Sequence, residues 1–292
     1  KLSEQGLHRL LTLLARDGEQ ALIVGGAVRN SLLGLPIDDI DIATSLEPKD
    51  VIDRLTNAGI RTIPTGLDHG TVTVLIGDYK YEVTTFREDI ETDGRHATVR
   101  FGRDMQRDAE RRDFTINAMA IELTTDQVEL IDLFGGVTDL LKRVIRTPES
   151  PEISFSDDPL RMLRAARFAA QLDFTIDPTV IEAMTTMKDR LSIISMERIR
   201  DEFIKTLMSS NPRIGLTILV DTGLCSLFLP EVPQLRLEID EHHHHKDVYE
   251  HTLTVVEQSI TGENRLGGPN LTLRLAALLH DIGKPKTRAL IP

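Results

Sequence analysis

The sequence predicts an α+β protein, in which an α/β head with a mixed or antiparallel sheet precedes an all-helical remainder. Three observations lead to this fold class. Strand patterns occur only before residue 148, and after it the apolar residues recur with helical period. A second break, at Pro230 to Pro233, precedes a histidine-rich segment. We therefore expect three domains, at residues 1–148, 149–232 and 233–292.

The elements of the head are bounded by glycine and proline. Gly34 and Pro36 close the second helix, and Gly77-Asp78 forms the turn of a hairpin. Residues 87–102 carry almost no apolar periodicity, which indicates a mobile loop of mixed charge. In chain order we expect a helix over 2–16, strand 21–24, helix 27–33, strand 40–43, a helix from about residue 48, hairpin strands 71–76 and 80–86, strands 118–123 and 128–133, and then helices 159–168, 178–187, 196–208 and 213–220.

Composition excludes several classes of protein. The 292 residues are 40% hydrophobic and 27% charged, which excludes a mostly disordered chain, and no apolar run is long enough for a membrane span. The single cysteine, Cys225, has no disulfide partner in the chain and fits a reducing compartment, so we expect a cytoplasmic protein. Aromatic residues are only 4% and the net charge is −12, so contact with nucleic acid requires a local basic face.

The first candidate site is Gly25-Gly26-x-x-Arg29, between a strand and a helix. Two glycines at such a turn let backbone N–H groups approach a phosphate at the helix N-terminus. A glycine pair on its own is more often only a tight turn, so the assignment depends on its neighbours.

Those neighbours are carboxylates on strands. Asp39 and Asp41 are two positions apart and therefore project from one face, and Glu82 lies inside the strand over 79–86. A solvated strand end is a less favoured alternative for Asp-x-Asp alone, and the outward face of an edge strand would explain Glu82. Together with the glycine turn, the three carboxylates predict a two-metal Mg²⁺ site for nucleotidyl transfer, with Asp39 and Asp41 as ligands and Glu82 as a further ligand or base.

With these motifs in place, the sequence resembles bacterial class II CCA-adding tRNA nucleotidyltransferases and the related poly(A) polymerases. The similarity covers residues 22 to 208 in the order of that family. Its motifs are Gly25 to Arg29 with Asp39 to Thr44, Arg111 to Ala120, the hinge-like Gly135-Gly136 with Asp139-Leu140 and Lys142 to Arg146, Asp157 to Arg161, and Met196 to Ile199 with Glu202 and Lys205. The resemblance implies addition of CCA to the 3′ end of tRNA from CTP and ATP, with release of pyrophosphate.

The resemblance also assigns roles to nucleotide-binding residues. Gly25, Gly26, Arg29, Arg112, Asp113 and Asn117 would hold the triphosphate and ribose, and Asp158 and Arg161 would read the base. On a helix, Asp158 and Arg161 are also explained as a surface ion pair. Arg164 and Arg167 extend the same stripe, which suits a triphosphate or RNA backbone better than the alternative of a solvated helix face.

The loop with Arg87, Arg95, Arg100 and Arg103 is similar to the flexible loop of the family, and a disordered surface loop is equally credible. Two positions depart from the family pattern. Asn30 stands where Asp is usual, so we do not place it at the metal, and Asp157 replaces the usual Glu.

The C-terminal segment has a separate pattern. His251 and His280-Asp281 resemble an HD-type phosphohydrolase domain, in which imidazole and carboxylate on facing helices hold a divalent metal. That fold has a further, later aspartate, and none follows Asp281 before Pro292. The run His242 to His245 is more simply a flexible polar segment than a ligand set.

Four functions remain open at the level of sequence. The first is a CCA-adding enzyme, and the second is a poly(A) polymerase or an enzyme that adds only part of CCA. The third is a metal-dependent phosphohydrolase whose head only senses nucleotides. The fourth is an RNA-binding module without catalysis, which the complete set of Asp39, Asp41 and Glu82 disfavours.

Overall fold

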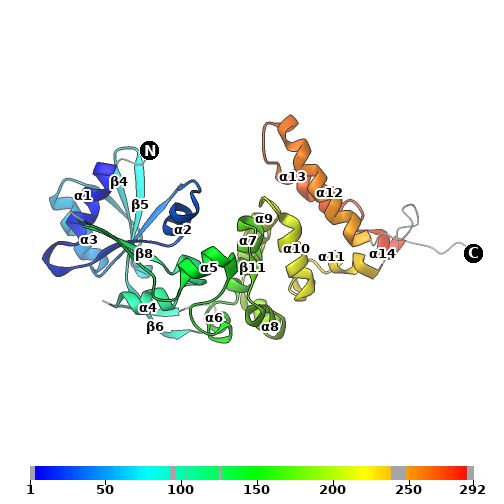
Figure 1. Cartoon of the computed structure of the whole chain (residues 1–292), viewed down its shortest axis with the longest axis horizontal. Helices are drawn as coiled ribbons and strands as arrows, with labels where there is room; N and C mark the ends of the chain where they lie inside the picture. The colour runs from blue at the N-terminus through cyan, green and yellow to red at the C-terminus, as the bar shows by residue number, and fades with distance from the viewer. Residues whose placement is uncertain (1–3, 93–96, 103, 125–126, 238–247, 288–292) are drawn as a thin grey trace, which may run out of the picture. The chain divides into compact units, whose positions relative to one another are not determined.

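The structure is a computed structural model, and it describes residues 4–92, 97–102, 104–124, 127–237 and 248–287. The chain divides into two compact units, which Figure 1 shows. The head unit comprises residues 1–142 and 146–150, and the helical unit comprises 143–145 and 151–292. The α+β fold class is confirmed, whereas the three-part division at residues 148 and 232 stays a prediction.

The head is built on a seven-stranded mixed sheet in the order β3-β4-β5-β2-β1-β8-β9. β2 and β5 pair in parallel, and the remaining pairings in this sheet are antiparallel. The strands are β1 (Ala21–Val24), β2 (Ile40–Thr44), β3 (Arg61–Gly66), β4 (Thr71–Ile76), β5 (Tyr79–Thr85), β8 (Ala120–Leu123) and β9 (Val128–Ile131). The helices are α1 (Glu4–Leu14), α2 (Gly26–Leu33), α3 (Pro48–Asn57), α4 (Met105–Glu110) and α5 (Gly136–Lys142), with a short 3-10 turn η3 (Thr115–Asn117).

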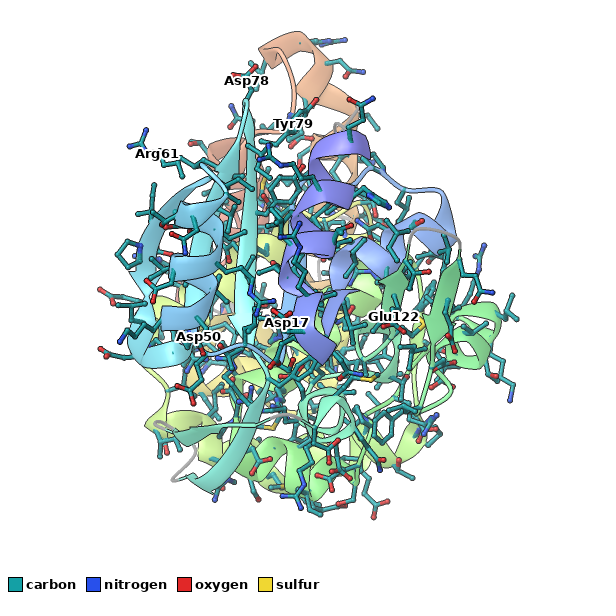
Figure 2. All side chains as sticks on the ribbon, turned by 90° about the vertical axis from the view of Figure 1, so that its left-hand side faces the viewer. Asp17, Asp50, Arg61, Asp78, Tyr79 and Glu122 are labelled. Atoms are coloured by element: carbon teal, nitrogen blue, oxygen red, sulfur yellow. The ribbon has the colours of Figure 1, made fainter. Side chains whose placement is uncertain are left out.

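One face of this sheet is buried under α1 and α3. Figure 2 looks onto these two helices, with Asp17 just past the end of α1 and Asp50 in the first turn of α3. Their leucine and valine side chains pack against Ile40, Ile42 and Tyr81 of the central strands. Since side chains alternate along a strand, Asp41 and Glu82 must project from the opposite face. The alternation of apolar residues along β2 and β5 therefore determines which face of the sheet carries the two carboxylates.

Two segments of the head differ from the sequence expectation. The strand β3 was not expected, because its Pro64 reads as a strand breaker, and it is tolerated here because β3 lies at the edge of the sheet. Residues 87–102 were expected to be a loop, but β6 (Arg87–Thr92) and β7 (Ala97–Phe101) form a separate two-stranded sheet. The residues of this hairpin carry almost no apolar periodicity, so the sequence pattern does not detect its strands. Residues 93–96, with Arg95, and Arg103 lie outside the described residues.

The second unit is helical apart from β10 (Val144–Ile145) and β11 (Thr175–Ile176), which form a short parallel pair. This pair was not expected, since each strand has only two residues. The helices of this unit are α6 (Pro151–Asp157), α7 (Leu160–Leu172), α8 (Pro178–Met187), α9 (Met196–Leu207), α10 (Pro212–Asp221), α11 (Glu231–Gln234), α12 (Val248–Gly262), α13 (Leu271–Leu279) and α14 (Lys284–Thr287).

A buried ion pair connects three helices of the second unit. Arg274 of α13 donates to Glu263 at 2.7 and 2.8 Å, and it also donates to the carbonyl oxygens of Leu207 and Ser209 at the end of α9. These hydrogen bonds lower the pKa of Glu263 to about 2. The pair satisfies the last carbonyl groups of a helix that would otherwise be buried without donors.

Cys225 is buried and free in the helical unit. Burial raises the pKa of its thiol to about 12, so it is an inert core residue rather than a nucleophile. Across the part of the chain that the structure describes, no helix combines the length and apolar character that a membrane crossing requires.

Candidate functional site

Gly25 forms the turn between β1 and α2 with a positive φ of 72°. A Cβ atom at this position would lie 3.3 Å from Nη1 of Arg112 and 3.7 Å from a carboxylate oxygen of Asp41. The backbone conformation therefore favours glycine, and a Cβ atom here would also press against the guanidinium of Arg112. The turn therefore lies beside the guanidinium of Arg112 and the carboxylate of Asp41, and its role in binding a phosphate stays a prediction.

Asp41 and Glu82 are directly opposite each other in the parallel pairing of β2 and β5. They consequently stand side by side on the face of the sheet away from α1 and α3. Asp39 immediately precedes β2 rather than lying within it. β5 lies between β4 and β2, so the interpretation of Glu82 as an outward residue of an edge strand is wrong.

The electrostatics of this cluster disfavour three negative charges. Partial desolvation, followed by the charges of Glu82 and Asp39, raises the pKa of Asp41, while the charges of Arg112 and Lys80 act in the opposite direction. Nζ of Lys80 lies 2.9 Å from Glu82, and this hydrogen bond raises the pKa of Lys80. Clustered carboxylate oxygens fit a hard divalent cation, which would relieve their repulsion.

Arg29 and Asn117 belong to a polar chain beneath the glycine turn. Arg29 donates to Oδ1 of Asn30 through two nitrogens, at 2.8 and 3.1 Å, and to Oδ1 of Asn117 at 2.6 Å. The amide of Asn117 in turn donates to Asp113 at 3.0 Å. The predicted nucleotide-binding residues Arg29, Asp113 and Asn117 are thus brought together. Asn30 holds Arg29 without cancelling its charge.

Arg112 is held by a residue that the sequence analysis missed. Its Nη2 donates to Oδ2 of Asp108 at 3.1 Å, and Asp108 also accepts the backbone N–H of Arg87 at 3.2 Å. Asp108 lies four positions before Arg112, and this helical spacing is the signal that could have found it.

Asp158 and Arg161 do not form the helix-borne pair that the sequence predicted. Asp158 lies between α6 and α7, where its carboxylate accepts the N–H of Leu160 at 3.1 Å. Its other oxygen is 3.1 Å from Arg198 of α9, and Arg161 donates to Ser154 at 3.0 Å. The helix breaks at Pro159, because proline disfavours helical conformation in the residue before it. The role of this pair in reading a base stays a prediction.

Arg164 and Arg167 point toward a buried acid. Nε of Arg167 is 2.7 Å from Glu202 of α9, and Nη1 of Arg164 is 4.0 Å from the same carboxylate. Glu202 is buried, and the side chain of Arg167 is only 11% exposed. The guanidinium of Arg167 also lies 4.2 Å from the ring centroid of Phe168. The alternative of a solvated helix face is therefore wrong for Arg167, whose charge is directed to Glu202.

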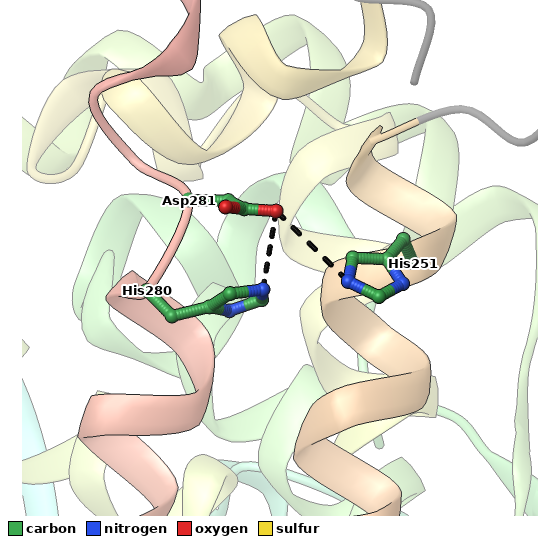
Figure 3. Close-up of side chains that lie close together, drawn as sticks. All are labelled: His251, His280 and Asp281. Atoms are coloured by element: carbon green, nitrogen blue, oxygen red, sulfur yellow. Dashed lines mark ion pairs between the residues drawn. The ribbon is translucent and has the colours of Figure 1, made fainter. Parts of the chain in front are cut away.

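His251, His280 and Asp281 meet at the ends of α12 and α13, as Figure 3 shows. Their ligand atoms all lie within 4.8 Å of one another, with Nε2 of His280 3.1 Å from Asp281. Nδ1 of His280 lies 2.7 Å from the carbonyl oxygen of Ala277, an arrangement that directs Nε2 toward the carboxylate. Two imidazoles and a carboxylate fit a transition metal. Nζ of Lys284 is 2.8 Å from Asp281. The run His242 to His245 lies outside the described residues.

Three family models match consecutive parts of the chain. They are the poly(A) polymerase head domain over residues 21–146, a probable RNA- and SrmB-binding site of polymerase A over 173–235, and an HD domain over 248–291. In chain order they describe a polymerase-type head, an RNA-binding segment and an HD domain. The expected head and the HD-type segment are confirmed by these matches.

Curated relatives agree with the family models. A CCA-adding enzyme from Streptococcus suis is 42% identical over 225 residues, which is 76% of this chain and 54% of that protein. A CCA-adding enzyme from Enterococcus faecalis is 43% identical over 218 residues, which is 74% of this chain and 52% of that protein. The chain therefore spans about half the length of the curated relatives that it matches.

Solved structures show the same fold. The CCA-adding enzyme of Bacillus stearothermophilus in complex with CTP matches with a TM-score of 0.73 and 35% identity over 95% of this chain and 66% of that one. A tRNA nucleotidyltransferase with a primer tRNA and an ATP analogue matches with a TM-score of 0.74 and 25% identity over 93% of this chain and 75% of that one. This chain belongs to the family of CCA-adding tRNA nucleotidyltransferases and poly(A) polymerases. Membership implies dependence on a divalent metal.

Proposed function

We propose that this protein adds CCA to the 3′ end of tRNA without a nucleic-acid template, using CTP and ATP and releasing pyrophosphate. The observation that carries the proposal is the cluster of Asp39, Asp41 and Glu82 beside the Gly25 turn, in a fold whose relatives are CCA-adding enzymes. A role in tRNA maturation also supports a cytoplasmic location.

We assign Asp39 and Asp41 as ligands for two Mg²⁺ ions, with Glu82 as a further ligand or as the base that receives the proton of the 3′-hydroxyl. When bound, such ions supply Lewis-acid activation of a hydroxyl and neutralise triphosphate charge. The donor set supports the assignment, because it is entirely carboxylate oxygen, and desolvation together with the charges of Glu82 and Asp39 raises the pKa of Asp41.

The remaining head residues bind and orient the nucleotide. The N–H groups that follow Gly25 face a phosphate, and Arg29 and Arg112 supply positive charge to the triphosphate. Asp113 and Asn117, joined by a 3.0 Å hydrogen bond, present polar groups for the ribose. With the nucleotide held, the 3′-hydroxyl of RNA attacks the α-phosphorus and the bond to pyrophosphate breaks.

We assign selection of the base to Asp158 and Arg161. Arginine presents a fork of donors and aspartate presents acceptors, a combination that matches the hydrogen-bonding edge of a base. Removal of either side chain should reduce the discrimination between CTP and ATP more than it reduces total incorporation. The measurement is the ratio of kcat/KM for the two nucleotides on a tRNA transcript that ends before CCA.

The decisive experiment supplies tRNA transcripts that end before CCA, after one C and after CC. Each transcript receives CTP alone, ATP alone or both with Mg²⁺, and the products are resolved to single nucleotides. Three additions that stop after A establish CCA synthesis. A long ladder of A instead identifies a poly(A) polymerase, and A added only after CC identifies a partial enzyme. If no transcript is extended, the proposal is wrong for this chain.

A second activity, metal-dependent phosphohydrolysis, is favoured by one observation, the trio of His251, His280 and Asp281. Binding of Mn²⁺, Ni²⁺ or Zn²⁺ measured by calorimetry should be lost in His280→Ala and kept in Asp41→Ala. Hydrolysis of a phosphodiester probe should follow the same pattern. Metal binding that survives removal of His280 would exclude the trio as the metal site.

A further inference from the structure

Asp108 is a buried carboxylate of the head with no part in the proposed chemistry. It lies in α4, and its side chain is 8% exposed. Its two oxygens have separate partners, Nη2 of Arg112 at 3.1 Å and the backbone N–H of Arg87 at 3.2 Å. A buried carboxylate needs donors for both oxygens. Here one donor is the side chain of Arg112 and the other is the backbone N–H of Arg87.

The partner Arg112 lies at the centre of the proposed site. Its Nη1 would be 3.3 Å from a Cβ atom at Gly25, and its charge opposes the rise in the pKa of Asp41. A free arginine side chain samples many rotamers, and each must be lost when the residue binds a ligand. Asp108 restricts this freedom in advance by holding one nitrogen of the guanidinium, which leaves the other beside the glycine turn.

The second partner, Arg87, is the first residue of the β6–β7 hairpin. The base of this hairpin is also closed by the N–H of Gly102, which donates to the carbonyl oxygen of Phe86 at 2.8 Å. One carboxylate therefore fixes both the guanidinium beside the Gly25 turn and the start of the hairpin.

We propose that Asp108 is a positioning residue that orients Arg112 for the triphosphate or ribose of the incoming nucleotide and aligns the β6–β7 hairpin with it. The proposal rests on the function assigned above to Arg112. Asp108 does not contact the reacting atoms and acts through its two partners. A buried ion pair with only a stabilising role would show the same distances, so the test must separate positioning from stability.

The test is a double-mutant cycle with Asp108→Asn, Arg112→Ala and the double variant. Asparagine retains one acceptor oxygen and turns an N–H₂ donor toward the other partner, so one of the two contacts is lost at nearly constant size. We expect KM for CTP and ATP to rise about tenfold, equivalent to about 1.4 kcal/mol, with kcat changed less than threefold. In the Arg112→Ala background the same substitution should change KM less than twofold.

Asp104→Asn is the matched control, because it makes the same chemical change in the same helix. Asp104 is exposed and caps α4 by accepting the N–H of Gln106, a contact that asparagine retains. Its KM values should equal those of the unmodified protein. Thermal unfolding and circular dichroism verify that each variant is folded. If Asp108→Asn does not fold, Asp108→Glu replaces it, with a smaller rise in KM that also disappears in Arg112→Ala.

Two results would overturn the proposal. One is an equal rise in KM with and without Arg112, which would mean that the two residues act independently. The other is an unchanged KM in a folded Asp108 variant. Failure of the proposed function is distinguished separately, because in that case the unmodified protein itself extends no tRNA. Direct calorimetric binding of CTP in Ca²⁺ gives a readout that does not depend on turnover, and Asp108→Asn should weaken it by the same factor.

Discussion

Asp41 in the head and Glu263 in the helical unit are both carboxylates, yet their surroundings shift their pKa values in opposite directions. Asp41 stands beside Glu82 and Asp39, and partial burial and these charges raise its pKa. Glu263 is buried with Arg274, whose hydrogen bonds lower its pKa to about 2. The first arrangement gathers like charges, and the second pairs opposite ones.

The difference separates a binding site from a structural contact. A fold that keeps repelling carboxylates together is destabilised by them, and this is explained when they bind a cation. Glu202 belongs to the structural kind, because Arg164, Arg167 and Lys205 surround it. The comparison therefore supports the proposed binding role of the head cluster and a packing role for Glu202 and Glu263, and each prediction below tests one of these roles.

The largest effect is expected for conversion of both Asp39 and Asp41 to alanine. Nucleotide incorporation should fall at least about a thousandfold, because the transition state loses roughly 4 kcal/mol or more of metal-mediated stabilisation. The melting temperature should stay equal or rise, since repulsion with Glu82 is removed. Asp38→Ala is the control, an exposed neighbour with no assigned role. Incorporation above a tenth of the normal rate in the double variant would contradict the assignment.

Glu263→Gln should lower the stability of the helical unit by about 3–5 kcal/mol, because Arg274 is left buried without its counter-charge. Glu257→Gln is the matched control. Glu257 pairs with Arg213 at 2.8 Å but is 46% exposed, so its loss should cost less than about 1 kcal/mol. Urea unfolding followed by circular dichroism measures both. Equal losses in the two variants would mean that burial does not distinguish the pairs.

The opposite pKa shifts of Glu263 and Asp41 predict that their contributions to stability change with pH in opposite directions. The pKa of Glu263 is lowered from about 4.5 to about 2, so its contribution to stability is complete above pH 4.5 and is lost as pH falls through 2. The pKa of Asp41 is raised, so the head loses stability as pH rises from 3.8 through the raised value. Melting temperatures are measured from pH 2 to 7. The loss of stability at low pH should disappear in Glu263→Gln, and the loss of stability with rising pH should disappear in Asp41→Asn.

The smallest effects are expected for the two arginines near Glu202, one of which is a close buried partner and the other a more distant, more exposed one. Arg167→Ala should destabilise the helical unit by about 1–3 kcal/mol, because it removes the close partner of buried Glu202. Arg164→Ala should cost less than about 1 kcal/mol, since Arg164 is 33% exposed and 4.0 Å from the acid. KM for nucleotides and tRNA should stay within twofold for Arg167→Ala. A raised KM with unchanged melting would restore the sequence-based role in binding triphosphate or RNA.

Much of the head could be predicted from the sequence, because its strands bury one regular face. The positions of Ile40, Ile42 and Tyr81 define that face, and Asp41 and Glu82 fall on the other by alternation. The periodicity of apolar residues could not identify β3, in which Pro64 is atypical of a strand. It also could not identify the β6–β7 hairpin, whose residues have almost no apolar periodicity.

Side-chain partners were harder to predict than elements. A helical stripe of Asp158, Arg161, Arg164 and Arg167 follows from spacing, but Asp158 lies before α7 and the two later arginines face Glu202. The acid comes from a different helix, so no local pattern contains it. Family motifs supplied the candidate nucleotide-binding residues, whose roles stay predictions, and the hydrogen-bonded pairs among them became visible only in three dimensions.

The pairing of Asp41 with Glu82 links the chemistry of the head to the course of its folding. The two residues are 41 positions apart (82 − 41) and meet only across the parallel strands β2 and β5. Loop closure of this length must precede the pairing, so non-local contacts of this kind form slowly. A slip of one residue would turn Glu82 toward the face covered by α1 and α3. Recovery of cation affinity during refolding therefore reports that the central sheet has reached its correct register.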